Sequence, residues 1–285
     1  MSWVSFFRDV LLLMKFRIIL ANAFAALCGY ILSGGDIFSL KTIFLFCGVF
    51  FLAGAGASLN QIFEREEDKI MLRTRLRPLP SGKMDVRTAL FIFFFLFFAG
   101  IVLLLKINFF SFIFAFLAFF IYDFIYTPLK KKTSFSLFVG ALVGALVPIS
   151  GVFAAKDLFS VNFYDFLLPV FLYFYQLPHT LSLFYVFGDD EWRKAGFKPF
   201  TIQDKKLFKF FILFLLVLAY FFGLIIIYRI DFFVFALSLV FAIFGFVRAI
   251  YNTRKIFYDL NAFALFVFVF PVIYAVIKVL KIKLF

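Results

Sequence analysis

Long apolar runs recur from one end of the chain to the other, and short polar connections separate them. A run of about 18 or more apolar residues is long enough to cross a lipid bilayer as a helix. The runs therefore predict an all-α, polytopic membrane protein with nine transmembrane helices. The predicted spans are residues 16–34, 42–59, 88–106, 109–127, 134–155, 163–187, 207–229, 231–250 and 261–282.

Positive charge is distributed unevenly between the two sets of connections. Of the 29 Lys and Arg residues, 22 lie before the first span or in every second loop after it, counting those in the adjoining ends of the spans. Because cytoplasmic loops are enriched in Lys and Arg, we expect the N-terminus inside and, with nine spans, the C-terminus outside. Lys278, Lys281 and Lys283 run against this pattern at the predicted outer end, and a different span count there would remove the conflict.

Composition narrows the class further. At 65% hydrophobic residues, 16% charged residues and a mean hydropathy of +1.08, the chain is not expected to be a soluble domain. Its 54 Phe residues fall mostly inside the apolar runs and are interpreted as lipid-facing. The net charge of +13 is explained by membrane topology, and no nucleic-acid partner is expected.

The cysteines, the first apolar stretch and the domain organisation each have a simple interpretation. Cys28 and Cys47 lie within apolar spans with no CxxC pair, so neither a disulfide framework nor a thiolate metal site is expected. The first apolar stretch is interrupted by Lys15 and Arg17 and then continues to Gly34, so we interpret it as a retained span rather than a cleaved signal. We treat residues 1–285 as a single membrane-embedded domain.

The densest charge cluster lies between the second and third spans, at residues 60–77. On a helix, Asn60, Glu64 and Asp68 stack along one face about 6 Å apart. Mg²⁺ is usually held by one or two carboxylates together with substrate phosphate oxygens, so this row is a candidate metal seat. Arg73 and Arg77 follow at once and suit a phosphate. The alternative is a solvated helix end with ordinary surface ion pairs.

Two more polar segments fall on the same predicted face of the membrane. The first runs from Tyr126 to Thr133 and contains three lysines, and the second begins at Gln176 and ends near Trp192. Asp189 and Asp190 in the second segment form another pair of carboxylates. The two acidic clusters on one face predict a two-part clamp for a metal and a diphosphate.

Several single residues are weighed separately. Met71, eleven residues after Asn60, either lines a substrate channel or packs. Asp123, one helical turn before Tyr126, is either functional or solvated at the membrane interface. We allow Lys130 a phosphate or propionate contact, and the lone His179 the role of a porphyrin contact or a polar plug. Gly140, Gly144 and Gly151 have the small-xxx-small spacing that permits close helix packing.

These motifs together resemble a known family. Asn60-x-x-x-Glu64-x-x-x-Asp68-x-x-Met71-x-Arg73-Thr74-x-x-Arg77-Pro78-Leu79 resembles the first signature of the UbiA superfamily of intramembrane prenyltransferases, and more narrowly that of the protoheme IX farnesyltransferases, or haem O synthases. Tyr126-Thr127-x-x-Lys130-x-x-Thr133 and Gln176-x-Pro178-His179 with Asp189-Asp190 are similar to the second and third signatures. Glu64 replaces the usual Asp, and Glu191-Trp192 stands where a single Tyr is common.

The resemblance implies a function. It implies farnesyl transfer from farnesyl diphosphate to a vinyl group of haem B, with Mg²⁺ as cofactor and haem A synthase or terminal oxidase assembly as partners in the cell (inner) membrane. The implied metal ligands are Asn60, Glu64, Asp68, Asp189 and Asp190, with His179 as a further catalytic residue. The implied substrate-binding residues are Arg73, Arg77, Lys130, Tyr126, Asp123 and Met71.

Two alternatives stay open. The nearer one is a prenyltransferase of the same superfamily that acts on a quinone precursor such as hydroxybenzoate. The more distant one is a transporter or a non-catalytic haem-binding membrane protein, which needs neither Mg²⁺ nor Asp68.

Overall fold

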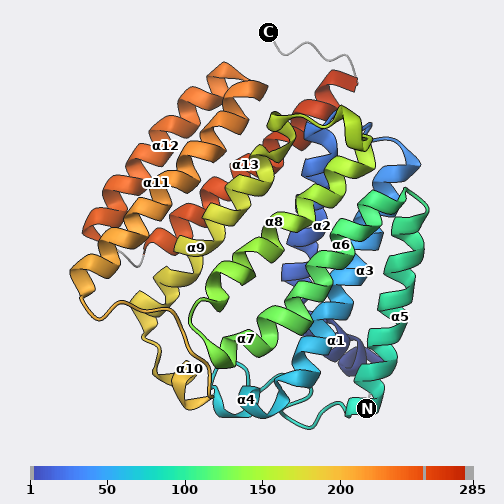
Figure 1. Cartoon of the computed structure of the whole chain (residues 1–285), viewed down its shortest axis with the longest axis vertical. Helices are drawn as coiled ribbons and strands as arrows, with labels where there is room; N and C mark the ends of the chain where they lie inside the picture. Colours follow the sequence, from blue (N-terminus) through green and yellow to red (C-terminus); the bar gives the residue numbers. More distant parts are fainter. Residues whose placement is uncertain (1–2, 253–254, 280–285) are drawn as a thin grey trace.

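The computed structural model describes residues 3–252 and 255–279, and within them it contains helices and no strand (Figure 1). The α-helices are α1 (Trp3–Leu13), α2 (Phe16–Leu32), α3 (Leu40–Phe63), α4 (Arg65–Ile70), α5 (Val86–Leu105), α6 (Phe109–Phe120), α7 (Thr127–Lys132), α8 (Ser136–Ala155), α9 (Leu167–Phe187), α10 (Asp190–Lys194), α11 (Lys205–Ile230), α12 (Phe232–Tyr251) and α13 (Ile256–Val279). A π-helix, η1 (Ile121–Tyr126), joins α6 to α7, and two short 3₁₀ helices, η2 (Leu158–Ser160) and η3 (Phe163–Phe166), precede α9.

Each predicted span coincides with a helix. How many of these helices cross the membrane is a separate question, because a helix must also be long and apolar enough. In the described part of the chain, seven helices are long and apolar enough to cross a membrane, and an eighth arises if the bent pair α1 and α2 forms one span. Helix α9 matches the sixth predicted span but is not among these, because Gln176, Pro178 and His179 interrupt its apolar sequence. The all-α membrane class is confirmed, and the count of nine stays a prediction. Lys281 and Lys283 lie outside the described residues.

Short polar side chains set where several helices begin. The Asp85 carboxylate accepts a hydrogen bond from the Thr88 backbone N–H at 3.2 Å, and Asn108 accepts one from Ser111 at 2.7 Å. Such caps satisfy backbone N–H groups that have no partner inside the helix. The Asn108 amide also donates to the Phe153 carbonyl at 2.7 Å, so the start of α6 is tied to the end of α8.

Glycines allow the central helices to approach closely. A Cβ on Gly151 of α8 would lie 1.9 Å from the Ala26 carbonyl oxygen of α2, and one on Gly29 would lie 2.3 Å from the Pro148 carbonyl oxygen. Backbone atoms of α2 and α8 therefore touch at two levels, as in other membrane helix pairs with small residues at the contact. The predicted packing role of Gly151 is confirmed.

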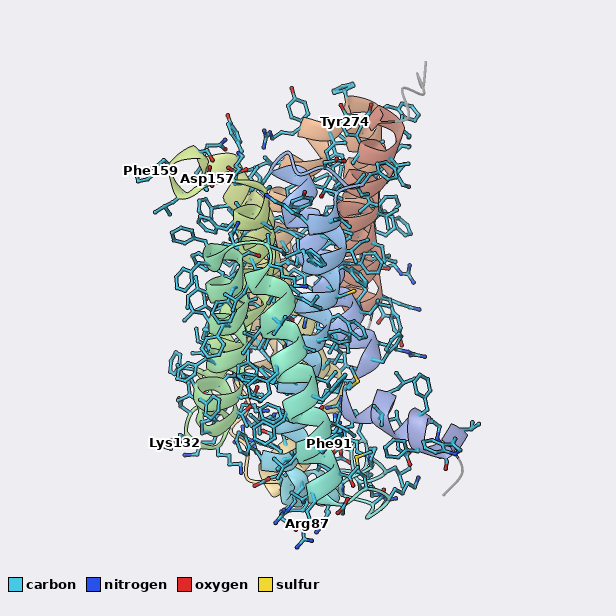
Figure 2. All side chains as sticks on the ribbon, turned by 90° about the vertical axis from the view of Figure 1, so that its right-hand side faces the viewer. Arg87, Phe91, Lys132, Asp157, Phe159 and Tyr274 are labelled. Carbon is cyan, nitrogen blue, oxygen red and sulfur yellow. The ribbon has the colours of Figure 1, made fainter. Side chains whose placement is uncertain are left out.

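The outer surface is rich in phenylalanine (Figure 2). On α5, Phe91, Phe94, Phe95 and Phe98 share one face and are 75%, 50%, 64% and 60% exposed. Their spacing places them along a single stripe of the helix. A stripe of exposed phenyl rings is what a lipid-facing surface needs, so the interpretation of Phe as lipid-facing holds.

Candidate active site

The polar motifs of the sequence meet at one end of the bundle. Helices α4, α7 and α10 all lie at that end, together with α1 and the N-terminus (Figure 1). Lys132 and Arg87 mark the same end in Figure 2, whereas Asp157 and Tyr274 mark the other. Segments about sixty and over a hundred residues apart in sequence therefore lie at the same end of the bundle. The prediction of one face for the motifs is confirmed.

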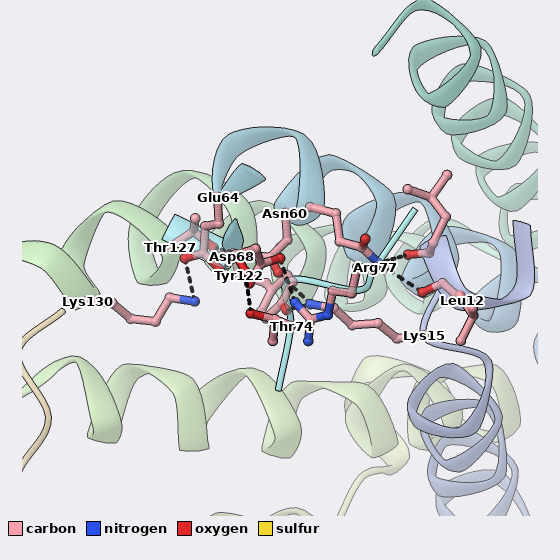
Figure 3. Close-up of polar contacts among 12 residues, drawn as sticks. Leu12, Lys15, Asn60, Glu64, Asp68, Thr74, Arg77, Tyr122, Thr127 and Lys130 are labelled. Atoms are coloured by element: carbon pink, nitrogen blue, oxygen red, sulfur yellow. Dashed lines mark hydrogen bonds and ion pairs between the residues drawn. The ribbon is translucent and has the colours of Figure 1, made fainter. Parts of the chain in front are cut away.

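Asn60, in the last turn of α3, is the centre of a buried hydrogen-bond network (Figure 3). Its amide nitrogen donates to Glu64 Oε2 at 3.0 Å and to Thr127 Oγ1 at 3.1 Å. Its oxygen accepts a hydrogen bond from Lys15 Nζ at 2.5 Å. Asn60 is 1% exposed, so these bonds replace solvation and fix the direction of the amide.

Glu64 lies at a break between two helices. Helix α3 ends at Phe63 and α4 begins at Arg65, yet the backbone bonds from Glu64 N to Asn60 O (3.0 Å) and from Asp68 N to Glu64 O (2.8 Å) keep the helical spacing. The Glu64 carboxylate forms an ion pair with Lys130 of α7 at 2.6 Å. Both side chains are largely buried, which makes the partner essential, because an unpaired charge there would be costly.

Asp68 is paired in the same way. Its Oδ2 lies 2.7 Å from a guanidinium nitrogen of Arg77, which lies in the loop that follows α4. The Thr74 hydroxyl donates to the Asp68 backbone carbonyl at 3.0 Å and anchors that loop. All three predicted ligands of the first cluster therefore lie at the site, and each has a hydrogen-bonding or ion-pairing cation.

The other carboxylates of α4 do not join this network. Glu66 is exposed and its bonds to Lys69 and Arg65 lie on the surface, where the hydrogen bond from Lys69 lowers the pKa of Glu66. Glu67 pairs with Lys131 at 2.5 Å. Only Glu64 and Asp68 are buried, so the surface ion-pair alternative fits Glu66 and does not fit the inner row.

The structure decides between the two roles considered for Met71. The helix stops at Ile70 and Met71 has extended backbone angles, so Met71 does not continue the helical row of Asn60, Glu64 and Asp68. Met71 is 2% exposed and packs with Ala195 and Phe197, against the ring of Trp192. The packing alternative is the one observed, and it attaches the first motif loop to the third.

A cavity of about 210 Å³ lies beside this network, between α2, α3, α6, η1, α8 and α9. Tyr122, Tyr126 and Lys15 are among its lining residues, and Lys15 is the charged one. The remaining lining is mostly small or aliphatic, and the residues are Ile18, Ile19, Asn22, Val49, Leu52, Ala53, Gly56, Ala57, Ala115, Ala118, Phe119, Leu137, Gly140, Ala141, Val143, Gly144, Val147, Gln176 and Thr180. An apolar chamber that opens on a charged network suits an amphiphile with an anionic head.

Asp123 is buried within the π-helix η1. It is 1% exposed, and in the described part of the chain neither carboxylate oxygen has a hydrogen-bond partner. A Cβ on Gly56, which lines the cavity, would lie 2.9 Å from Asp123 Oδ2. Of the two alternatives for Asp123, the solvated interfacial carboxylate is therefore wrong. Single π-helical turns are frequent at functional sites, and this one places Asp123 behind the cavity wall.

The third motif approaches the first through side-chain packing. The Arg73 guanidinium lies 5.6 Å from the ring centre of Trp192, and the Lys198 backbone N–H donates to the Lys130 carbonyl at 2.8 Å. Asp189 forms an ion pair with Arg193 at 2.6 Å, and Asp190 is exposed at the start of α10. Among the described residues, no three Asp, Glu, His or Cys side chains are placed to hold a metal ion. The five predicted ligands are thus not gathered, and the two-part clamp stays a prediction.

His179 faces a different neighbour. Its Nδ1 lies 3.4 Å from the Tyr175 hydroxyl, which hydrogen-bonds Asn261 of α13. Gln176 and Thr180 of the same helix line the cavity, whereas His179 is not among the lining residues. His179 therefore lies next to the Tyr175 hydroxyl that connects α9 to α13.

Comparison with known protein families shows to which family the chain belongs. The model of the UbiA prenyltransferase family matches residues 22–270, most of the chain. The chain belongs to the UbiA prenyltransferase family. A protoheme IX farnesyltransferase of Flavobacterium psychrophilum is 36% identical over 197 residues, 68% of this chain and 64% of that protein. One of Flavobacterium johnsoniae is 37% identical over 211 residues, 72% of this chain and 69% of that protein. The matches thus span about two thirds of the relatives' lengths.

The fold agrees with other members of the UbiA family. The structure of a UbiA homologue from Archaeoglobus fulgidus bound to DMAPP and Mg²⁺ superposes with a TM-score of 0.71, covering 96% of this chain and 100% of that chain at 15% identity. At this identity the likeness establishes the fold alone.

One member of the polar network of this UbiA-family site is not evident from the motifs. Lys15 precedes α2, and in the sequence it reads as a basic residue that interrupts an apolar stretch. Its contacts with Asn60 and Tyr122 depend on segments 45 and 107 residues away. The only local signal was a lysine inside an apolar stretch, which membrane topology explains equally well.

Proposed function

We propose that the protein transfers a farnesyl group from farnesyl diphosphate to a vinyl group of haem B and so makes haem O. The observation that carries this proposal is the 36–37% identity to protoheme IX farnesyltransferases, combined with a charged network at the end of an apolar cavity. The haem acceptor comes from the relatives, because the cavity lining does not itself specify a porphyrin.

The side chains of the first motif fit Mg²⁺. Asn60, Glu64 and Asp68 supply oxygen donors, which hard cations prefer, and Mg²⁺ commonly needs only one or two carboxylates beside substrate phosphates. Each of these side chains faces a protein cation in this structure, so the position already favours positive charge. We include Asp189 and Asp190 in the proposed set. The ion would supply Lewis-acid stabilisation of the charge on the departing diphosphate.

The chain's own cations would bind the diphosphate. Arg77 forms an ion pair with Asp68, and Lys130 forms one with Glu64. The Arg73 guanidinium lies over the ring of Trp192. Guanidinium groups bind phosphate oxygens in pairs, and a lysine adds a point charge. We propose that Arg73 and Arg77 hold the diphosphate while Lys130 contacts it from α7.

The cavity would hold the prenyl chain and exclude water. Cleavage of the allylic C–O bond leaves a carbocation, which water would quench, so an apolar chamber favours attack by the vinyl carbon. The attack forms the new C–C bond and leaves the positive charge on the vinyl carbon next to the porphyrin ring, where a water molecule would add and release a proton to give the hydroxyl group of haem O. Tyr122 and Tyr126 line this chamber, and a cation that lies over an aromatic ring is stabilised by the ring quadrupole. Asp123 behind Gly56 adds a carboxylate near the same chamber. We propose that His179 contacts the porphyrin from the α9–α13 side.

The cellular setting follows from charge and class. We propose that residues 1–285 form one domain in the cell membrane with the motif-bearing end in the cytoplasm, because most basic residues lie in that set of connections. Haem A synthase or terminal oxidase assembly factors are the proposed partners, since they use haem O downstream.

Expression in a host that lacks haem O tests the function. Mass spectrometry of extracted haems should show haem O with the wild-type chain and only haem B with the empty vector. A wild-type chain that is well expressed but leaves only haem B would refute the proposal. A prenylated hydroxybenzoate in its place would favour the quinone-precursor alternative.

A further inference from the structure

A second cavity lies at the end of the bundle opposite the charged network. Its volume is about 550 Å³, and it lies between the ends of α2 and α11, the start of α9 and the last turns of α13. Tyr274, one of its lining residues, marks this end in Figure 2. No residue of the three sequence motifs lines this cavity, so the proposed prenyl transfer does not account for it.

The lining of this cavity changes from polar to apolar within about one helical turn. Arg229 and Tyr164 line its rim and are exposed, whereas Ile226 and Leu168 line it deeper in the bundle and are buried. Three residues of an α-helix rise about 4.5 Å, which separates Ile226 from Arg229 along α11. A polar rim above an apolar floor at the end of a membrane bundle suits an amphiphile whose head group lies at the membrane surface.

Arg229 supplies the positive charge of the rim. Its guanidinium carbon lies 4.1 Å from the ring centre of Tyr164. Among the residues that the structure describes, no carboxylate lies within 4.0 Å of Arg229 and no acceptor takes a hydrogen bond from its side chain. A guanidinium that lies over an aromatic ring keeps its N–H groups available for the oxygens of a phosphate. Arg229 is therefore suited to bind a phosphate at the rim.

Asp36 supplies a negative charge at the same rim. It lies in the loop between α2 and α3, is exposed, and accepts a hydrogen bond from the Phe38 backbone N–H at 3.0 Å. In the described part of the chain, no lysine or arginine lies within 4.0 Å of its carboxylate. The other carboxylate of the lining, Asp165, is already paired with Lys156 at 2.7 Å. The rim thus has one unpaired cation and one unpaired anion.

We propose that this cavity binds a zwitterionic phospholipid whose head group carries a phosphate and a primary ammonium, as in phosphatidylethanolamine. The phosphate accepts hydrogen bonds from Arg229, the ammonium donates to Asp36, and the acyl chains lie against the apolar floor. Pockets with basic residues between membrane helices are known to bind lipid head groups. The proposal is independent of prenyl transfer, because the charged network lies at the other end of the bundle.

The two charges of the rim favour this lipid over its alternatives. A purely anionic lipid such as phosphatidylglycerol satisfies Arg229 but brings a negative charge next to Asp36, and like charges repel each other. The quaternary ammonium of phosphatidylcholine has no N–H group, so it cannot donate a hydrogen bond to Asp36. A lipid with a primary ammonium satisfies both side chains.

Native mass spectrometry of the purified, delipidated full-length protein tests the proposal. The protein is mixed with equal concentrations of phosphatidylethanolamine, phosphatidylglycerol or phosphatidylcholine, and melting temperatures are recorded in parallel. The wild type should bind phosphatidylethanolamine about threefold or more tightly than either other lipid, which is the effect of one exposed ion pair. Phosphatidylethanolamine should also raise its melting temperature the most.

Two variants separate the two charges. Arg229→Gln should weaken binding of all three lipids about tenfold, because they share the phosphate. Asp36→Asn keeps the oxygen that accepts from Phe38 and should bind phosphatidylethanolamine and phosphatidylglycerol equally well. This second result concerns which lipid binds, so a loss of folding stability cannot imitate it.

Lys106→Gln is the matched control. Lys106 follows α5, which begins beside Arg87 at the motif end and so ends at this one. It is an exposed cation 5.5 Å from the ring centre of Phe44, and it does not line the cavity. The variant should bind all three lipids like the wild type.

Four results would overturn the proposal. They are equal binding of the three lipids by the wild type, an unchanged lipid preference in Asp36→Asn, wild-type lipid binding by Arg229→Gln, and the same loss of lipid in Lys106→Gln as in Arg229→Gln. Inorganic phosphate is the remaining probe and should leave the melting temperature unchanged. Stabilisation by inorganic phosphate as large as that by phosphatidylethanolamine would show a site for the free anion and would overturn the lipid.

Discussion

Asp68 is the side chain through which the metal-diphosphate proposal is most directly tested. Its carboxylate is nearly buried, with a side chain 4% exposed, and it faces Arg77 at 2.7 Å. Asp68→Ala removes a proposed metal ligand and leaves Arg77 without its anion. Asp68→Asn keeps the shape and the hydrogen-bonding oxygen but removes the charge. The two variants therefore separate the role in chemistry from the role in folding.

We expect the two variants to lose similar amounts of turnover but different amounts of folding stability. Loss of one group that stabilises transition-state charge lowers turnover by about 10²-fold or more, which corresponds to about 2.7 kcal/mol. We expect this loss in both variants, because both lack the negative charge. Asp68→Ala should in addition destabilise the fold by about 1–2 kcal/mol, since Arg77 is only 23% exposed and loses a charged hydrogen bond. Asp68→Asn should lose less than half of that.

The assay is farnesyl transfer to haem B by purified protein, measured by mass spectrometry across a Mg²⁺ titration, with melting temperatures recorded in parallel. Glu66→Ala is the control, because Glu66 is a carboxylate of the same short helix with a side chain 62% exposed. It should behave like the wild type. Wild-type turnover by Asp68→Ala, or turnover that ignores chelation by EDTA, would refute the reasoning.

Three further predictions address other parts of the molecule. Glu64→Asp should reduce turnover by less than about tenfold in the same transfer assay, because it keeps the charge that faces Lys130, and a loss equal to that of Asp68→Ala would contradict this. Gly151→Ala should destabilise the protein by about 3 kcal/mol or more, visible as a lower melting temperature, because the new Cβ would lie 1.9 Å from a backbone oxygen that no side-chain rotation relieves. Reporters fused after residue 80 should report the cytoplasm and those after residue 156 the outside, and the same side for both would show that the span count is wrong.

Local sequence determined the helices and part of the site. Apolar runs of bilayer length have few ways to satisfy their backbone hydrogen bonds, so they become helices wherever they occur. The spacing of Asn60 and Glu64 placed them in contact because the helical repeat alone brings residues four apart together, and their hydrogen bond shows it. Gly151 was predicted to pack a helix from its spacing, and its position against Ala26 agrees.

Tertiary structure decided which charges meet and which polar groups are enclosed. The pairing of Glu64 with Lys130 and the bond from Lys15 to Asn60 join segments from separate helices. Periodicity carries no information about such pairs, because it reports only neighbours along one helix. For the same reason it could not tell whether Asp123 faced water or the bundle interior, nor on which side of α9 His179 would lie.

The turn at Lys15, where φ is 55°, shows most clearly what local sequence cannot predict. A lysine has no local preference for positive φ, so nothing in its neighbours along the chain predicts the bend. The bend exists because Gln61 and Asn60, held by α3, bind its backbone and side chain from 45 or more residues away. The sequence contained every residue of the site, and the packing of α1, α2 and α3 selected the conformation in which Lys15 enters it.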